Sequence, residues 1–177
     1  HEVASTFELK VFSTIEAAGK YKRSMEALEN AIVALEHDST LTAVNLAGNV
    51  IGDESVWRVA AALEHNYTLT DINLAGTVIG SQGAERVAAA LKQNTSLTSL
   101  DLAQNEIGPQ GAECLAAAVQ HNTTLTTLNL EGNHISNQSK ERVAAALERN
   151  KAGVLVLTIT CESQGPEHCV IVCKTTG

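Results

Sequence analysis

A 28-residue repeat is the feature that most constrains this chain of 177 residues. Segments that begin at Leu35, Leu63, Leu91 and Val119 align over their whole length, and the third reads "LKQNTSLTSLDLAQNEIGPQGAECLAAA". The four copies cover residues 35–146, nearly two thirds of the chain. A unit this short cannot bury its apolar faces alone, so the copies must stack against one another. The repeat therefore predicts a solenoid.

Each copy combines two hydrophobic periods. Leu100 and Leu102 alternate with polar residues, which indicates a short strand with one apolar face. The apolar residues of 84–91 recur at i, i+3, i+4 and i+7, which indicates a helix. The dipeptides Gly80-Ser81 and Gly108-Pro109 mark helix starts. One strand and one helix per copy predict a parallel sheet backed by a layer of helices. Because helices are wider than strands, the stack should curve with the sheet inside.

The predicted fold class is therefore α/β, a right-handed solenoid with the parallel sheet on its concave face and the helices on its convex face. A C-terminal β-hairpin caps it, because an open solenoid has apolar ends. We expect three parts. Residues 1–34 form an N-terminal capping strand and helix, residues 35–150 hold the four repeats, and residues 151–177 form C-terminal capping strands.

Both ends read as modified repeats. Residues 7–12 alternate like a strand, and residues 24–38 have helical spacing, which predicts a degenerate leading repeat. At the other end, residues 154–160 predict a strand that continues the sheet after a one-residue insertion. A Gly-Pro turn and a second strand over residues 169–174 follow, so we expect a hairpin that closes the sheet edge.

The pattern LxxLxLxxNxL stands here as Leu97, Leu100, Leu102, Asn105 and Ile107. It resembles the leucine-rich repeat family. The period and the helical half are most similar to the ribonuclease-inhibitor subclass, which includes ribonuclease inhibitor, the repeat domains of NOD-like receptors and the Ran GTPase-activating protein. Tropomodulin is a looser resemblance. The resemblance implies a concave face that binds protein.

The resemblance also implies that the repeated Asn turns inward and satisfies backbone groups where the strand ends. Asn49, Asn105 and Asn133 match that position, and Thr77 departs from it. An unpartnered buried backbone group costs about 1–3 kcal/mol, so we expect Thr77 or a water to substitute. Lys140 falls where the other copies have Val or Ala, which predicts a looser stack there, with the Lys stem along the core.

The residues between the core leucines form the candidate partner-binding surface. The alternative is that these small polar side chains only solvate an exposed sheet. The surface has few of the aromatic and Arg residues that anchor tight interfaces, which argues against a tight complex of the ribonuclease-inhibitor kind. The contacts that we expect are Asn45, Asp71, Asn73, Ser99, Asp101, Gln104, Thr127, Asn129 and Glu131.

Two aromatic residues interrupt the repeat on its helix and loop side. Trp57 occupies a helical position that holds Glu in the later copies, so it either covers the N-terminal cap or is an exposed contact. Tyr67 replaces Thr in the loop before a strand.

The four cysteines are too sparse for a disulfide framework in a domain of this size, so we expect reduced thiols. A Cys161–Cys169 disulfide across the hairpin is the alternative. Zinc binding is disfavoured because Cys169 and Cys173 would lie about 13 Å apart along one strand. The glycosylation pattern occurs at Asn66, Asn94, Asn122 and Asn137, and the first three share one position of the repeat, which explains them equally well.

Function classes are narrowed by charge and by motifs. The net charge of −8 opposes binding to nucleic acid and to anionic membranes. We find no triad, no phosphate-binding loop and no metal motif, so we expect no enzyme activity, no cofactor and no metal. The sequence predicts a monomeric, cytoplasmic signalling module that binds a partner protein on its concave sheet. The alternatives, from family resemblance, are a small-GTPase regulator and an actin-capping module.

Overall fold

The computed structural model describes residues 5–8, 17–152, 155–161 and 169–175, with side chains for residue 26 and residues 28–152. Strands and helices alternate strictly up to residue 151. In chain order the elements are β1 (Ser5–Glu8), α1 (Ala17–His37), β2 (Leu41–Asn45), α2 (Gly52–His65), β3 (Asp71–Asn73), α3 (Ser81–Leu91), β4 (Ser99–Asp101), α4 (Pro109–His121), β5 (Thr127–Asn129), α5 (Asn137–Lys151), β6 (Leu155–Cys161) and β7 (Cys169–Thr175).

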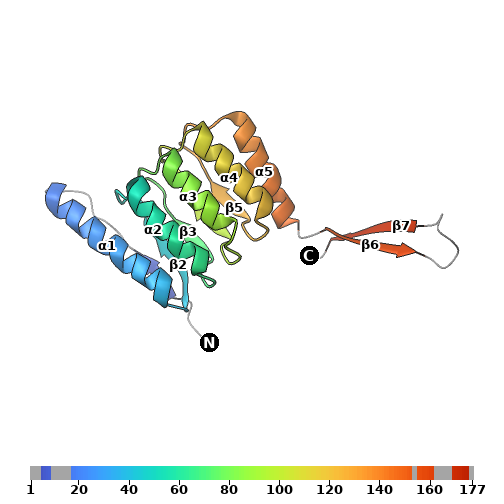
Figure 1. Ribbon diagram of the computed structural model, residues 1–177, viewed down its shortest axis with the longest axis horizontal. Coiled ribbons are helices and arrows are strands. Elements are labelled where there is room, and N and C mark those ends of the chain that lie inside the picture. Colours follow the sequence, from blue (N-terminus) through green and yellow to red (C-terminus); the bar gives the residue numbers. More distant parts are fainter. Residues whose placement is uncertain (1–4, 9–16, 153–154, 162–168, 176–177) are drawn as a thin grey trace.

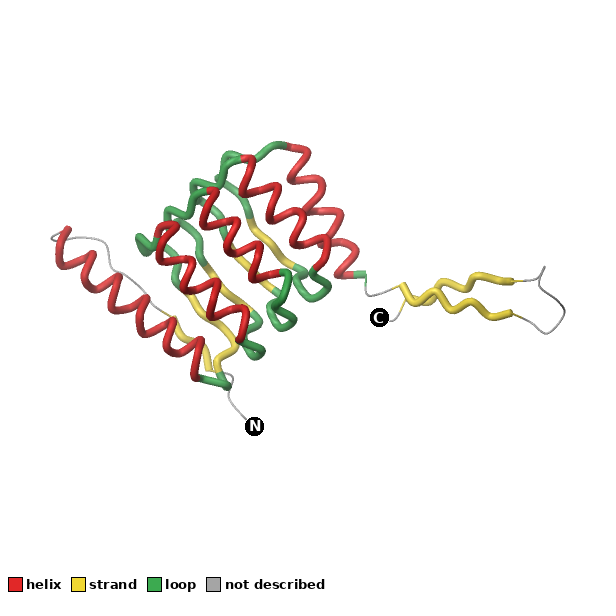
Figure 2. The backbone as a smooth tube through the Cα atoms, in the orientation of Figure 1, coloured by secondary structure: helices red, strands yellow, loops and turns green. Residues whose placement is uncertain are grey.

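The sheet has the order β1-β2-β3-β4-β5, and all of its pairs are parallel. From β2 to β5 each residue pairs with its equivalent in the next repeat, so Val44, Ile72, Leu100 and Leu128 form one row. Helices α1 to α5 lie side by side in one layer over one face of this sheet (Figure 1; Figure 2). The structure confirms the predicted α/β solenoid of a parallel sheet and a layer of helices, and equivalent residues of successive repeats pair with one another across the sheet.

The predicted leading repeat is present with shifted bounds. β1 begins at Ser5 rather than at Phe7 and pairs in parallel with β2. α1 begins at Ala17, earlier than the expected helix over residues 24–38. Residues 9–16, which include the rest of the expected first strand, lie outside the described residues.

Strand leucines and helix alanines form the core between the two layers. Leu100 and Leu102 have no exposed surface, and neither do Ala116 and Ala118 on the facing helix α4. Small residues let the helices approach closely. A Cβ added to Gly111 would lie 2.9 Å from the Cβ of Ala84, so glycine is required where α4 begins against α3.

Three asparagines just before the strands join the repeats to one another. We call Asn66, Asn94 and Asn122 the strand-start asparagines, and all three are buried. The Oδ1 atom of Asn94 accepts from the backbone N–H groups of Ser96 and Leu97, at 3.0 and 2.8 Å. Its Nδ2 donates to the carbonyl oxygens of Leu63 and Asn66 in the preceding repeat, at 2.8 and 2.9 Å. One side chain therefore shapes its own turn and ties it to the previous one.

The two ends of this series differ as their surroundings require. Asp38 has the same repeat position, and its Oδ1 accepts from the backbone N–H of Thr40 at 2.8 Å. A carboxylate suffices there because only an acceptor is used, and the Thr40 bonds lower the pKa of Asp38. Asn150 continues the series at the other end, where its Nδ2 donates to the carbonyl of Asn122 at 2.9 Å.

The contacts of the strand-start asparagines also show whether three of the glycosylation patterns can be used. Their side-chain nitrogens are buried and donate hydrogen bonds to the preceding repeat, so no glycan can be attached there in the folded chain. The sequence allowed two interpretations of these patterns, a glycosylation site or a position of the repeat, and the repeat explains them. Asn137, by contrast, is exposed at the start of α5.

The second asparagine series, after the strands, behaves as the family resemblance implied. Asn105 donates from Nδ2 to the carbonyl of Leu74 at 2.8 Å and accepts from the N–H of Ile79 at 3.0 Å. Thr77 substitutes for Asn as predicted, because its Oγ1 donates to the carbonyl of Leu74 at 2.7 Å. Its backbone carbonyl accepts from the N–H of Gly52 at 3.0 Å. The next residue, Val78, has a φ of 61°, a strained conformation for a β-branched residue.

The C-terminal hairpin forms, but its first strand does not continue the parallel sheet. β6 pairs in antiparallel register with β7, and the five-stranded sheet ends at β5 (Figure 1). The expectations of a sixth parallel strand over residues 154–160 and of a hairpin that closes the sheet edge are therefore wrong. The next strand along the chain offers an antiparallel partner at low loop-closure cost, and this local pairing is favoured.

The strand-start asparagines predict a large effect of a single substitution. Asn94→Ala leaves two carbonyl and two N–H groups without their partner in a buried region, so we expect it to lower the free energy of unfolding by about 3 kcal/mol. Urea denaturation measures this change. Thr95→Ala, at the exposed next residue, is the control and should change it by less than about 0.5 kcal/mol. A loss below about 1 kcal/mol for Asn94→Ala would contradict the assigned role.

Candidate functional site

The structure brings seven of the nine predicted contact residues together on one surface, and it places Gln104 and Glu131 in the turns that follow β4 and β5. We call this surface the sheet face, meaning the side of β2 to β5 away from the helices. Neighbouring strands are in register, so the candidates form columns across it. All nine candidates are exposed or half-buried. The first column is Ala43, Asp71, Ser99 and Thr127, and the second is Asn45, Asn73, Asp101 and Asn129.

The second column has a structural role that sequence reasoning missed. The Oδ1 atom of Asn73 accepts from the backbone N–H of Ala75 at 2.9 Å, and Asp101 does the same for Ala103 at 2.9 Å. Asn45 and Asn129 make equivalent bonds. The signal was available in the sequence, since Asn and Asp form this two-residue turn readily. The turn uses one oxygen of each residue, and the remaining polar atoms can meet a partner.

The sheet face is acidic. Asp71, Asp101 and Glu131 come from three successive strand ends and cross the face diagonally. Asp71 accepts a hydrogen bond from the Oγ1 of Thr70 at 2.6 Å. The described strands β2 to β5 contain no Lys or Arg that could neutralise these carboxylates. A positively charged partner surface is the electrostatic complement.

Gln104 is held in a conformation that favours glycine. Its φ is 56°, and the equivalent residues of the other copies, Gly48, Gly76 and Gly132, have φ between 64° and 73°. The Gln104 side chain is exposed and lies over Gly132, where an added Cβ would clash with the Gln104 amide. A non-glycine residue here costs on the order of 1 kcal/mol. Such strain often accompanies a functional position, so Gln104 stays among the candidates.

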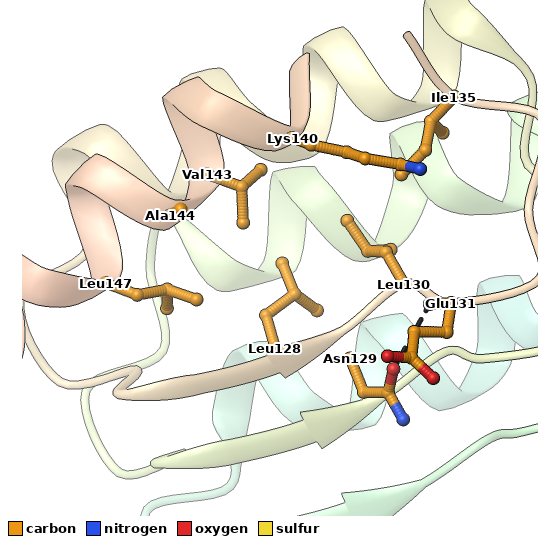
Figure 3. Close-up of a pocket in the computed structure, with 9 residues that line it drawn as sticks. All are labelled: Leu128, Asn129, Leu130, Glu131, Ile135, Lys140, Val143, Ala144 and Leu147. Atoms are coloured by element: carbon orange, nitrogen blue, oxygen red, sulfur yellow. Dashed lines mark hydrogen bonds between the residues drawn. The ribbon is translucent and has the colours of Figure 1, made fainter. Parts of the chain in front are cut away.

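A hollow of about 360 Å³ lies beside β5 and α5, at the end of the five-stranded sheet. Leu128, Val143 and Leu147 line it with Lys140 and Glu131 (Figure 3). Lys140 is exposed, while its counterparts in the earlier copies are fully buried. Val143 and Leu147 keep 5% and 8% exposure, which agrees with the looser stack predicted at Lys140.

Ion pairs cross the helix layer on the opposite side of the molecule. Arg58 on α2 forms a two-fold pair with Glu29 on α1, and Arg142 on α5 pairs with Glu113 on α4. The Glu29 hydrogen bond is the main cause that raises the pKa of Arg58, and the same bond lowers the pKa of Glu29. Trp57 is adjacent to Arg58 and is 55% exposed, so its side chain is open to solvent, and its role as a contact stays a prediction. Tyr67 is 68% exposed.

The remaining candidates form no cluster among the described residues. Cys114 is a half-buried free thiol that packs against the core. No group of three His, Cys, Asp or Glu side chains within residue 26 and residues 28–152 is placed to hold a metal ion. Cys161 and Cys169 are opposite one another in the hairpin register, but their side chains lie outside the described residues, as does that of Cys173.

Comparison with family models identifies the repeats. The leucine-rich repeat model matches residues 37–56, 65–88, 93–116 and 121–139, which coincide with the four copies and with the strand-to-helix units of the fold. This chain is a leucine-rich-repeat protein. Leucine-rich repeats serve protein–protein interaction, which is the general function that the match supports.

Two solved structures with leucine-rich-repeat domains are similar to this chain. Leiomodin-1 actin-binding site 2 is 27% identical with a TM-score of 0.64, and the match covers 71% of this chain and 73% of that one. The tropomodulin C-terminal domain from Caenorhabditis elegans is 20% identical with a TM-score of 0.51, over 70% of this chain and 93% of that one, and shows the fold alone. A comparison with curated proteins finds no match. No helix within the described residues is long and apolar enough to cross a membrane.

Gln104 supplies a test of the backbone strain at its position. Gln104→Gly removes the strain at a φ of 56°, so we expect the free energy of unfolding to rise by about 1 kcal/mol in urea denaturation. Gly76→Gln, the opposite exchange in the preceding repeat, should lower it by a similar amount. A Gln104→Gly variant less stable than the natural chain would show that the Gln104 amide contributes more to folding than its backbone strain costs.

Proposed function

We propose that the chain is a non-enzymatic protein-binding module and that its sheet face holds the partner. The observation that carries this proposal is the gathering of seven polar side chains on one face that no described element covers, with Gln104 and Glu131 in the turns at its edge. The strands fix the spacing of these side chains, so the face is a preorganised surface of donors and carboxylates. A preorganised surface loses little entropy on binding, because its side chains are already ordered.

The chemistry of the face defines the kind of partner. Asp71, Asp101 and Glu131 attract Lys and Arg side chains, while the amide groups of Asn45 and Asn129 can donate to backbone carbonyls. The face has no aromatic anchor, so the affinity comes from polar complementarity and electrostatic steering rather than from apolar burial. Such an interface is expected to weaken as salt is added.

Actin is the first candidate partner, and the similarity to leiomodin-1 actin-binding site 2 favours it. This similarity supports the tropomodulin-like alternative of the sequence analysis more than the small-GTPase alternative or the ribonuclease-inhibitor subclass, which stay predictions. A monomeric state and a cytoplasmic location are part of this proposal, and both are compatible with a cytoskeletal partner.

Co-sedimentation with actin filaments and fluorescence titration of actin monomers test the proposal. We expect the natural chain to bind, and a triple variant with Asp71 and Glu131 replaced by Lys and Asp101 replaced by Asn, which keeps the oxygen that closes the turn, to lose at least about ten-fold in affinity, since close charge pairs contribute more than about 1.4 kcal/mol together.

The matched control acts on the helices, where it replaces Glu36 and Glu64 by Lys and Glu141 by Gln, so that the net charge changes equally. This control should bind nearly as well as the natural chain. Equal losses in the two triple variants would overturn the sheet face as the binding surface. Absence of any binding by the natural chain would overturn actin as the partner.

A further inference from the structure

The ion pairs of the helix layer follow a rule. An Arg on one helix pairs with a Glu on the preceding helix that stands one position earlier in the repeat. Arg58 pairs with Glu29 between α1 and α2, and Arg142 pairs with Glu113 between α4 and α5. The rule follows from the stacking, because equivalent positions of successive copies lie side by side on neighbouring helices, and the adjoining Arg can reach the Glu from there.

The rule fails between α2 and α3. Arg86 is the equivalent arginine, and the position from which a Glu would pair with it holds Trp57 instead. Arg86 is exposed, and no carboxylate of the described residues lies within ion-pair distance of it. The next step has no arginine at all, since Cys114 stands there, and Glu85 instead accepts a hydrogen bond from Gln110 at 2.8 Å. Arg86 is thus the arginine of this series that lacks its carboxylate.

Exposed apolar side chains lie on the two helices beside Arg86. Trp57 is 55% exposed on α2, and Ala61 lies one turn after it and is also exposed. Ala89, one turn after Arg86 on α3, is exposed as well. Glu54 lies one turn before Trp57 on the same helix. Its negative charge repels a partner's carboxylate, so such a carboxylate is favoured on the side of the indole that faces Arg86. We call Trp57, Ala61, Arg86 and Ala89 the α2–α3 ridge.

We infer that the α2–α3 ridge docks a partner segment in which a carboxylate side chain neighbours an aliphatic one. The carboxylate pairs with Arg86 as Glu29 pairs with Arg58, and the aliphatic side chain packs on the Trp57 ring and Ala61. Trp and Arg are the residue types that dominate binding energy at protein interfaces. The ridge lies on the helix side, so this surface is independent of the sheet face and the inference does not rest on the proposed function.

The overall charge makes this interaction selective. The chain carries a net charge of −8, which repels acidic segments in general. An acidic segment that binds must therefore meet a local cation without a partner, and Arg86 provides one. Arg142 and Arg58 are already paired with glutamates, so they offer matched controls with the same side chain in the same helical position.

Trp57 is the sole tryptophan of the chain, so its fluorescence reports on this ridge alone. The experiment titrates the full chain with the capped peptide Ser-Gly-Leu-Glu-Leu-Gly-Ser and with versions that carry Gln or Lys in place of Glu. We expect a saturable change of Trp57 emission with the Glu peptide and binding at least about ten-fold weaker with the Gln and Lys peptides, the size of a charged hydrogen-bonded pair.

Two arginine variants decide the assignment. Arg86→Gln should weaken binding of the Glu peptide by about ten-fold, while Arg142→Gln should leave it unchanged. No saturable change with the Glu peptide, or equal binding to the Arg86→Gln variant, would overturn the inference. Because actin binding through the sheet face uses other residues, the Arg86→Gln variant should still bind as the natural chain does there.

Thermal melting tests the pairing rule independently of any peptide. Trp57→Glu completes the series and supplies Arg86 with a carboxylate, so its melting temperature should exceed that of Trp57→Gln, which has the same size without the charge. Equal or reversed melting temperatures would show that Arg86 does not accept a carboxylate from this direction, and would contradict the proposed docking geometry.

Discussion

The buried side-chain amide between repeats is the interaction on which the rest of the structure depends. Each strand-start asparagine closes the turn of its own repeat and donates to the carbonyls of the previous one. The amide can do both, because it has donors on its nitrogen and acceptors on its oxygen on one short side chain. Asp38 shows the complementary case, since it uses an acceptor alone. Successive repeats are therefore connected by buried hydrogen bonds as well as by packed leucines.

These joints explain why the sheet can serve as a binding surface. The spacing of the strands is fixed by the buried leucines on the helix side of the sheet and by the asparagines at the strand starts. A partner therefore binds a surface that does not rearrange. The outward side chains can then vary without loss of the fold. The second column is an exception, because its oxygen closes the turn after each strand, and this restricts those positions to Asn and Asp. The α2–α3 ridge varies on the helix side in the same way, where Trp57 replaces a repeated Glu.

Most of the repeat stack could be predicted because its information is local and recurs in every copy. The leucine rows, the helix starts at Ser81 and Pro109 and the substitution by Thr77 all follow from comparing one copy with another. The hairpin could not be placed, since β6 occurs once and its pairing with β7 competes with the sheet edge. The strand-start asparagines were missed as joints because their Asn-x-Ser/Thr pattern also fits a glycosylation site. The sequence did not single out Arg86, because it does not show which positions of neighbouring helices lie close together, and so it does not show that Trp57 stands where a Glu would pair with Arg86.

Native-state hydrogen exchange tests the central claim most directly. The N–H groups of Leu69, Leu97 and Leu125 each donate to a strand-start asparagine, at 2.7, 2.8 and 2.7 Å. If these asparagines join the repeats, the three amides should exchange only when the whole stack unfolds, with free energies equal to the global value. Exchange of these amides at the rate of an exposed turn, while the helices stay protected, would contradict the account.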